Sequence, residues 1–383
     1  MNIGCKLLLL CGKLGAYLPI GGKAFLKVVN FIFSIFDSKN VNLPSAQTAE
    51  SILQKYHEDV KSSAICSNEV VEDNIDLQII VPAYNVEKYI DKCIGSVLLQ
   101  STKYRYKLII INDGSTDCTG ELLSKYKQKE QVVIISQGNK GFSGARNSGL
   151  QKLYAKYIMF LDSDDTLVPG AIDELMDMAY DYDADIVQGG FYLVQNNCIR
   201  KENIPIFNNN ADGMQLAGFP WGKVYKASLF YNICLPEKYW FEDSLTKLII
   251  VPKAKRVCTL NKPVYKYLYN PNGITNTYYG KLKSIDTFYV TRSLLGDAKQ
   301  LGLFSENKGY YQRQLSKQIR INAIRTFVLG EEISKSIFIL TKILLESLFD
   351  PSDYALLRRS KILNAILSNN YLLYRRLCCL YLD

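Results

Sequence analysis

The chain has 383 residues, of which 48% are apolar and 22% charged, so it can build a hydrophobic core and still cover it with polar side chains. This composition excludes a disordered protein and a small disulfide-stapled domain. The 46 basic residues outnumber the 37 acidic ones, giving a net charge of +9 that predicts an anionic partner or surface. The single histidine excludes a histidine-rich zinc site, so any metal or proton chemistry must rest on carboxylates.

The first 36 residues hold no acid and are interrupted by four lysines, Lys6, Lys13, Lys23 and Lys27. On one continuous helix these lysines would lie opposite a row of leucines, Leu7, Leu10, Leu14 and Leu18. Pro19, Gly21 and Gly22 disfavour such a helix, and the short apolar runs resemble a signal peptide only loosely. We prefer a lysine-edged amphipathic segment on a membrane surface; a helix packed on the main domain is the alternative.

Residues 37–75 are polar and weakly patterned, which indicates a linker or a loosely docked helix. They carry the only histidine, His57, which we expect at the surface. Residues 1–75 are thus expected to form an N-terminal extension. No apolar stretch of the sequence reaches the ~18 residues that a membrane-spanning helix needs.

From Leu77 onward, short apolar runs alternate with segments of helical period, as in βαβ units with a mostly parallel central sheet. The apolar runs are residues 77–81, 108–111, 132–135, 157–161 and 186–187. Between the first two runs, a helix face is predicted from Ile90, Cys93, Ile94, Val97 and Leu98. Residues 76–280 are therefore expected to form an α/β domain.

The last part of the chain, residues 281–383, carries helical periodicity without strand signals, so we expect a helical C-terminal region. Its end is basic, with Arg358, Arg359, Lys361, Arg375 and Arg376. These residues are consistent with contact to an anionic surface, which we interpret as a membrane rather than nucleic acid. The alternative is the solvated face of an ordinary helix. The ten cysteines form no Cys-x-x-Cys pair, which favours a reducing compartment. We expect a cytoplasmic protein, peripheral on the inner face of the membrane if the basic ends bind it.

Polar side chains follow three of the predicted strands, at residues 82–85 (Pro-Ala-Tyr-Asn), 112–117 (Asn-Asp-Gly-Ser-Thr-Asp) and 162–165 (Asp-Ser-Asp-Asp). Each segment alone is consistent with a turn or a helix cap. Because ligands bind beyond the carboxyl ends of parallel strands, the three together predict one cleft.

The acidic segment at residues 162–165 predicts a divalent cation, because crowded carboxylates repel one another and hard oxygen ligands favour Mg²⁺ or Mn²⁺. Such a cation is normally shared with substrate phosphates. The chain has neither a G-x-x-x-x-G-K-[ST] loop nor a G-x-G-x-x-G turn after its first strand, which excludes P-loop NTPases and dinucleotide dehydrogenases. Phosphates must then be held by the metal, by backbone N–H groups and by Arg146.

Residues 76–275 resemble the family-2 glycosyltransferases, which have the GT-A fold. The matching stretches are residues 80–85, 111–117, 144–150, 160–165, 221–226, 241–244 and 273–275. The resemblance implies an inverting, single-displacement transfer of a sugar from a nucleotide diphosphate sugar, with a UDP-sugar favoured, to an acceptor hydroxyl. We expect a hexosyl or N-acetylhexosaminyl group and a glycan or lipid-linked acceptor in cell-surface polysaccharide synthesis.

The resemblance also implies roles for individual residues. Pro82, Tyr84 and Asp113 would line the base and ribose pocket, and Asp162 would contact the ribose. Arg146 would contact the base or diphosphate. Asp164 would bind the metal, with Asp165 assisting. In the acidic pair before a helix, Asp243 would be the general base, with Glu242 as the next candidate; a helix cap is the alternative role for Asp243.

The chain lacks the Q-x-x-R-W motif of processive synthases, and no histidine of the domain is available as a metal ligand. Diphosphate and water must therefore complete the metal site. Further diphosphate contacts would come from Lys223, Lys226, Tyr267 or Thr275. Two other functions remain as alternatives: a non-catalytic sugar-nucleotide-binding or scaffolding subunit, and a nucleotidyltransferase, which the lack of a glycine-rich basic loop near the first strand disfavours.

Overall fold

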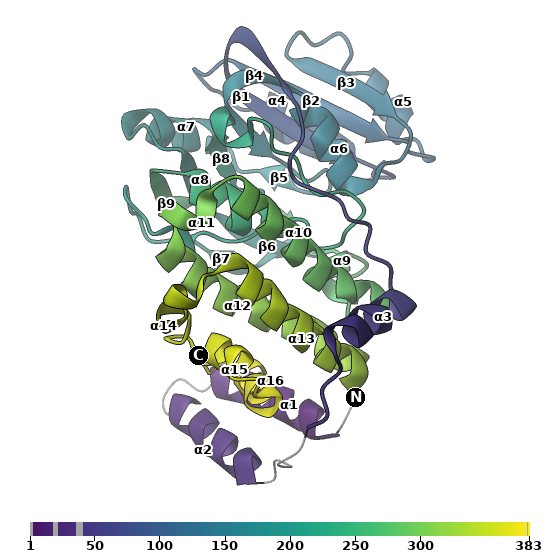
Figure 1. The fold of residues 1–383 in the computed structure, drawn as a ribbon. Helices are drawn as coiled ribbons and strands as arrows, with labels where there is room; N and C mark the ends of the chain where they lie inside the picture. The colour runs from purple at the N-terminus through teal and green to yellow at the C-terminus, as the bar shows by residue number, and fades with distance from the viewer. Residues whose placement is uncertain (1–2, 18–21, 36–40, 381) are drawn as a thin grey trace. The chain divides into compact units, whose positions relative to one another are not determined.

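The computed structural model describes residues 3–17, 22–35, 41–380 and 382–383 (Figure 1). These residues divide into two compact units. The sheet unit comprises Ser62–Lys238 and Glu242–Pro271, and the helical unit comprises Met1–Lys61, Tyr239–Phe241 and Asn272–Asp383. Of the expected N-terminal extension, residues 1–61 fall in the same unit as the C-terminal helices, whereas residues 62–75 fall in the sheet unit.

The sheet unit is built on a nine-stranded sheet in the order β3-β2-β1-β4-β8-β6-β9-β5, with β7 beside β6. The strands are β1 (Glu69–Ala83), β2 (Tyr106–Asp113), β3 (Val132–Gln137), β4 (Lys152–Phe160), β5 (Thr166–Leu167), β6 (Ile186–Gln195), β7 (Cys198–Asn203), β8 (Lys223–Lys226) and β9 (Val257–Leu268). The α/β class is confirmed. Pairing is parallel from β3 to β4 and between β6 and β9, whereas β8 and the short strands β5 and β7 pair antiparallel with their neighbours.

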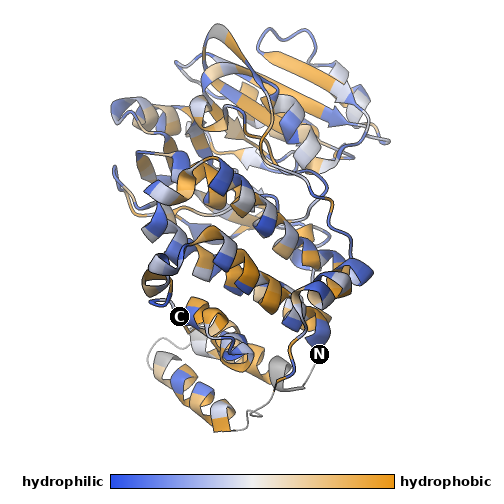
Figure 2. Ribbon diagram, viewed as in Figure 1, coloured by the Kyte–Doolittle hydropathy of each residue, from blue (hydrophilic) through white to orange (hydrophobic). Residues whose placement is uncertain are grey.

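The core lies around the central strands, which are coloured as apolar in Figure 2. Leu77, Ile79, Ile80 and Val81 of β1 are all fully buried, so both faces of this strand are covered. A strand buried on both faces has an unbroken apolar sequence, which explains why residues 77–81 gave a clear strand signal.

The helices of the sheet unit are α4 (Ile90–Leu98), α5 (Thr119–Ser124), α6 (Gly141–Leu150), α7 (Ala171–Asp181) and α8 (Val251–Lys253), with a π-helical segment at Thr246–Ile250 before α8. Helix α4 buries Ile90, Cys93, Ile94 and Val97, as its spacing predicts. Helix α6 lies very close to β1, because a Cβ atom at Gly149 would be 2.5 Å from Ile80 Cγ2.

The helical unit contains α1 (Ile3–Tyr17), α2 (Gly22–Ile35), α3 (Ala46–Tyr56), α9 (Ile274–Thr277), α10 (Asp286–Gln300), α11 (Leu303–Glu306), α12 (Lys308–Thr326), α13 (Glu331–Leu348), α14 (Tyr354–Leu357), α15 (Lys361–Leu367) and α16 (Tyr371–Leu380). Helix α3 packs on α13, while α1 packs on α2 and α16. No strand occurs in the described residues after β9, as expected for the C-terminal region.

The prediction that His57 is a surface residue is wrong. Its Nε2 atom lies 2.6 Å from Oδ1 of the fully buried Asp286, and its side chain is 23% exposed. Tyr289 donates a hydrogen bond to the His57 carbonyl oxygen at 2.9 Å. The segment around His57 is therefore fastened to α10 rather than loosely attached. Contacts between residues so far apart in sequence leave no trace in local periodicity.

Helices α1 and α2 leave apolar side chains exposed. On α1 these are Leu7, Leu10 and Leu14, and on α2 they are Phe25, Val28, Phe31, Ile32 and Ile35. Leu18, Pro19 and Gly21 lie outside the described residues, as do the side chains of Lys6 and Lys23. None of the described helices is both long and apolar enough to cross a membrane.

The basic C-terminal residues do not share one environment. Arg358, Arg359 and Lys361 are exposed. Arg376 is instead buried, and its Nε donates to Asn30 Oδ1 of α2 at 3.0 Å. The expectation that Arg376 faces an anionic surface is therefore wrong, because this residue fastens α16 to α2.

Candidate active site at the strand ends

The carboxyl ends of β1, β2 and β4 converge on a cavity of about 420 Å³. Its lining consists of Pro82, Ala83, Tyr84, Val86, Asp113, Asn139, Gly141, Phe142, Ala145, Arg146, Asp162, Ser163 and Asp164. We call it the acidic cavity because three aspartates face it and Arg146 is the only basic residue in that lining. All five residues expected to bind the nucleotide line this cavity, together with Asp164.

Two loops at the cavity are tied together by the residues of the turn motifs. Asn85, which has a positive φ of 51°, accepts a hydrogen bond from the Thr116 amide at 2.8 Å. The backbone amide of Asn85 donates a hydrogen bond to Ser115 Oγ at 3.2 Å. Gly114 has a φ of +74°, and a Cβ atom there would be 2.9 Å from the Asn139 nitrogen. Glycine is required at this turn, which positions Asn139 at the cavity wall.

Asp113 is held rigidly at the end of β2. Its side chain is almost fully buried, and Oδ1 accepts hydrogen bonds from Gln137 Nε2 at 2.7 Å and from the Lys140 amide at 2.9 Å. Gln137 is the last residue of the neighbouring strand β3, and Lys140 follows that strand. The carboxylate therefore has a fixed orientation at the cavity, which suits a group that accepts a hydrogen bond from a ligand.

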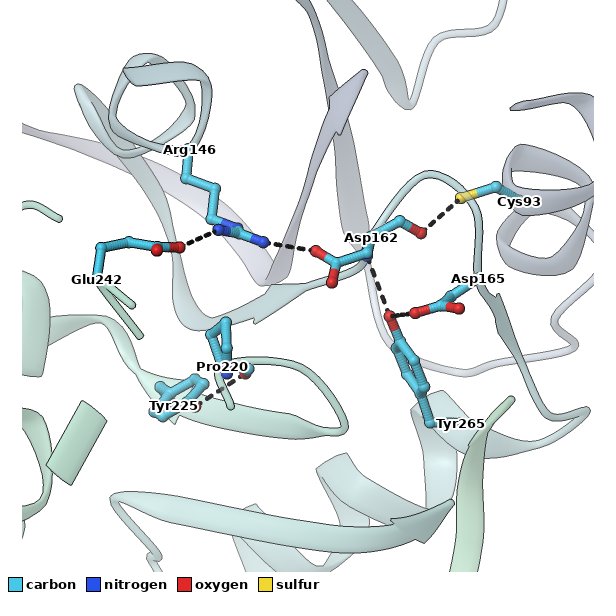
Figure 3. A network of polar contacts seen from close by, with 8 residues as sticks. All are labelled: Cys93, Arg146, Asp162, Asp165, Pro220, Tyr225, Glu242 and Tyr265. Atoms are coloured by element: carbon cyan, nitrogen blue, oxygen red, sulfur yellow. Dashed lines mark hydrogen bonds and ion pairs between the residues drawn. The ribbon is translucent and has the colours of Figure 1, made fainter. Parts of the chain in front are cut away.

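Arg146, which is 7% exposed, joins two acids that are far apart in the sequence (Figure 3). Its Nη2 donates to Asp162 Oδ1 at 2.7 Å, and its Nη1 donates to Glu242 Oε1 at 2.9 Å. Burial alone would lower the pKa of Arg146, but the two carboxylates outweigh burial and hold that pKa above its ordinary value. This bridge was not foreseen from the sequence, in which Glu242 was assigned only to proton transfer.

Glu242 has an unusual electrostatic environment. It is 6% exposed, and burial raises its pKa to about 8, with a smaller contribution from the negative charge of Asp243. Arg146 acts in the opposite direction and lowers the pKa. Glu242 therefore changes its protonation state close to neutral pH, unlike an ordinary carboxyl group.

Asp164 and Asp165 have different surroundings although they are adjacent. Burial, and then the charge of Asp162, raise the pKa of Asp164, which lines the cavity. Asp165 is not in the lining: its Oδ2 accepts from the Tyr265 hydroxyl at 2.8 Å (Figure 3). Its Oδ1 accepts from the Leu268 backbone amide at 2.7 Å. We therefore omit Asp165 from the candidate metal site, because its contacts give it a structural role in holding β9.

The carboxylates of the cavity fit a divalent cation only in part. Among the described residues, no group of three or more His, Cys, Asp or Glu side chains forms a metal site. Asp164 and Asp162 are nevertheless close enough for the charge of one to raise the pKa of the other, and a cation relieves such repulsion. One or two carboxylates with phosphate oxygens and water are the usual ligands of Mg²⁺ in nucleotide sites.

Asp243 follows Glu242 in a turn that leads into the helical segment 244–253. It is half-buried, and it is absent from the lining of the acidic cavity. Its charge acts on Lys223, which is fully buried. The Lys223 Nζ atom donates to the carbonyl oxygens of Phe219 at 2.7 Å and Trp221 at 3.3 Å.

The contacts of the two lysines that were expected to bind the diphosphate, Lys223 and Lys226, disfavour that role for both. Lys223 is fully buried with its ammonium group bonded to two backbone carbonyls, and burial holds its pKa well below its ordinary value, which favours a structural role over phosphate binding. Lys226 is paired with Asp183 at 3.0 Å and with Asp185 at 3.6 Å. Tyr267 is half-buried and stacks on Trp221, and Thr275 belongs to the other unit. Neither lysine thus supports the expected contact.

Comparison with known proteins gives the following relatives. Residues 78–227 match the family model described as Glycosyl transferase family 2. The chain is 30% identical over 231 residues to Glycosyltransferase GlyA of Streptococcus pneumoniae, covering 55% of this chain and 33% of that protein. It is 33% identical over 220 residues to the Bacillus subtilis protein described as Uncharacterized glycosyltransferase EpsJ, covering 53% and 64%. The chain therefore spans one third to two thirds of the length of these relatives.

The fold is also similar to a solved structure. The crystal structure of S. aureus TarS 1-349 in complex with UDP-GlcNAc superimposes with a TM-score of 0.61 at 19% identity, covering 79% of this chain and 90% of that chain. This similarity supports the GT-A expectation for the fold.

Proposed function

We propose that this chain, whose residues 78–227 match the family-2 glycosyltransferase model, transfers a sugar from a nucleotide diphosphate sugar to a hydroxyl of a glycan or lipid-linked acceptor. In this proposal the transfer inverts the anomeric carbon. The observation that carries the proposal is that Pro82, Tyr84, Asp113, Arg146, Asp162 and Asp164 line one cavity. UDP is our first choice of nucleotide, because the structurally similar TarS was crystallised with UDP-GlcNAc.

In the proposed reaction, Asp113 accepts a hydrogen bond from the base and Asp162 one from the ribose. Asp164 holds Mn²⁺ or Mg²⁺, which when bound would neutralise charge on the departing diphosphate. Asp243 takes the proton of the acceptor hydroxyl. As it does so, the acceptor oxygen bonds to the anomeric carbon, and the bond from that carbon to the diphosphate oxygen breaks. We prefer Asp243 to Glu242 as the base, because Glu242 Oε1 already accepts a hydrogen bond from Arg146 at 2.9 Å.

A sugar-nucleotide screen tests this function against a non-catalytic binding subunit. Wild-type protein is incubated with Mn²⁺ and UDP-, GDP- or dTDP-sugars, and release of the nucleotide diphosphate is measured. We expect slow hydrolysis of one UDP-sugar without acceptor, and faster release with one. A protein that binds UDP but consumes no sugar nucleotide with any acceptor would support the non-catalytic function instead.

The helical unit supports a peripheral position on an anionic membrane surface. Apolar side chains of α1 and α2 are exposed, as are Lys13 and Lys27 on the same helices. A basic residue near an anionic leaflet contributes up to about 1 kcal/mol, and inserted apolar side chains add to it. We expect the full chain to sediment with anionic liposomes at low salt and less at high salt.

Two matched variants make this membrane test specific. Phe31→Ser removes an exposed aromatic side chain of α2, and Ile206→Ser removes an exposed apolar side chain of the sheet unit. Only Phe31→Ser should weaken sedimentation. Wild-type protein that stays in the supernatant at low salt would refute membrane binding and leave both ends as ordinary packing helices.

A further inference from the structure

A second cavity, of about 530 Å³, shares Asp164 with the acidic cavity. It is formed by the start of α4, strand β5, the turn between β6 and β7, and the end of β9 with the residues that follow. Three lysines line it: Lys88, Lys92 and Lys266. We call it the lysine cavity. All of its lining belongs to the sheet unit.

The charge of the lysine cavity is opposite to that of its neighbour. Asp164 is the only acid in a lining that contains three lysines. Within the described residues, the ammonium groups of Lys88, Lys92 and Lys266 form no hydrogen bond or ion pair. Other lysines of this unit are paired, such as Lys262 with Glu174 and Lys125 with Asp91 at 3.1 Å. Unpaired ammonium groups around one cavity repel one another, and a bound anion relieves that repulsion.

The rest of the lining suits a ligand rich in hydroxyl groups. Asn196 and Asn197, with positive φ angles of 51° and 59°, form the tight turn between β6 and β7. Gln195 beside them adds a third amide, and Tyr89 and Tyr269 add aromatic rings with hydroxyl groups. Amides both donate and accept hydrogen bonds, so they pair with sugar or polyol hydroxyls, whereas lysines bind phosphate as point charges.

We propose that the lysine cavity is the acceptor subsite and that the acceptor carries a phosphate group beside the hydroxyl that receives the sugar. This proposal rests on the proposed function, because the donor sugar must lie near Asp164, the residue common to both cavities. Lys88, Lys92 and Lys266 bind the phosphate and so place the hydroxyl at that shared wall. The phosphate belongs either to a polyol-phosphate chain or to the diphosphate of a lipid-linked glycan.

Binding measurements with the acidic cavity filled test this assignment. Protein saturated with UDP and Mn²⁺ is titrated with three probes: a synthetic glycerol-phosphate hexamer, a short-chain prenyl diphosphate and neutral maltohexaose. We expect one of the two phosphate probes to bind and maltohexaose to bind at least about tenfold more weakly. The phosphate probe that binds identifies the source of the phosphate.

A matched pair of variants separates the cavity from general charge. Lys88→Gln/Lys92→Gln/Lys266→Gln removes three charges from the cavity, whereas Lys127→Gln/Lys129→Gln/Lys255→Gln removes three from lysines outside its lining. The first variant should weaken binding of the phosphate probe about tenfold or more and flatten its salt dependence, while the affinity for UDP changes less than about twofold. The control variant should leave both affinities unchanged.

Three results would overturn the proposal: no binding of either phosphate probe to the wild type, equal losses in the two variants, or loss of UDP affinity in the cavity variant. The last result would assign the lysines to the donor diphosphate. Retained UDP affinity also shows that the cavity variant is folded. Failure of the proposed function is a separate outcome, because it would appear as a wild type that neither binds nor consumes any sugar nucleotide.

Discussion

The two cavities that meet at Asp164 are built in different ways. The acidic cavity is formed by short motifs at the ends of parallel strands, where the backbone fixes each side chain: Asp113 is the last residue of β2, and Asp162 and Asp164 follow β4. The lysine cavity is formed by long side chains from segments that are far apart in the sequence. A site whose residues are placed by strand ends is readable from sequence, whereas one assembled from isolated lysines is not.

The largest predicted effect is on turnover, in a variant that should leave ligand binding to both cavities intact. Asp243→Asn keeps the size and capping ability of the side chain but removes its basicity, so turnover should fall by roughly 10²- to 10⁴-fold. Binding of UDP and of the phosphate probe should remain. Steady-state kinetics with the active sugar nucleotide measures this. Near-wild-type turnover would show that Asp243 acts as a helix cap, and Glu242 would become the candidate base.

The next prediction concerns the arginine bridge at the acidic cavity. Arg146→Met leaves the partly exposed Asp162 and the buried Glu242 without their cation, and removing one partner of a buried pair costs about 3–5 kcal/mol. Urea denaturation should show this loss. At alkaline pH, adding Glu242→Gln should recover part of the stability, because Glu242 is then no longer a buried carboxylate without its cation. Equal stabilities of the wild type and Arg146→Met would contradict the bridge.

The raised pKa of Glu242 predicts how the stability of the folded protein depends on pH. Its pKa in the folded protein, about 8, lies above its ordinary value of 4.5. Glu242 therefore contributes its full stabilisation of the folded state below pH 4.5, its pKa in the unfolded chain, and loses that contribution as pH rises through about 8. Melting temperatures of wild type and Glu242→Gln, measured from about pH 5 to about pH 9, should show the wild type losing stability relative to the variant. Parallel pH profiles would contradict the raised pKa.

The smallest predicted effect is confined to one cavity. Gly114→Ala introduces a Cβ atom 2.9 Å from the Asn139 nitrogen at a φ of +74°, so the loop carrying Asn139 must shift. We expect UDP affinity to fall by roughly three- to tenfold, corresponding to about 1 kcal/mol. Gly170→Ala is a matched control, because it has a similar φ of +80° but no atom within 4 Å of the added Cβ. Binding of the phosphate probe should not change in either variant.

Much of the fold could be predicted because local pattern reports burial. Strand β1 and helix α4 gave clear signals, since one is buried on both faces and the other on a single stripe. The antiparallel half of the sheet was missed, because β5 has two residues and β8 has four, too few for a period. The partial burial of His57 depends on Asp286, 229 residues away, and α3 packs on the distant helix α13; no local pattern encodes either contact.

The same distinction applies to the candidate site. Pro82, Tyr84 and Asp113 were found because they lie in contiguous motifs. Asp165 is held outside the lining of the acidic cavity by hydrogen bonds from Tyr265 and Leu268. Arg146 pairs with Glu242, 96 residues away. Tertiary contacts therefore decide which member of an acidic cluster faces the ligand and which one supports it.

The most direct test of the central claim is calorimetry of UDP binding to wild type, Asp164→Ala and Asp181→Ala, each with Mn²⁺ and with EDTA. Asp181 is an exposed acid at the end of α7, outside both cavities. We predict Mn²⁺-dependent binding to the wild type and to Asp181→Ala, and loss of that binding in Asp164→Ala. Tight UDP binding to Asp164→Ala in EDTA would contradict the assignment of Asp164 as the metal-binding residue common to both cavities.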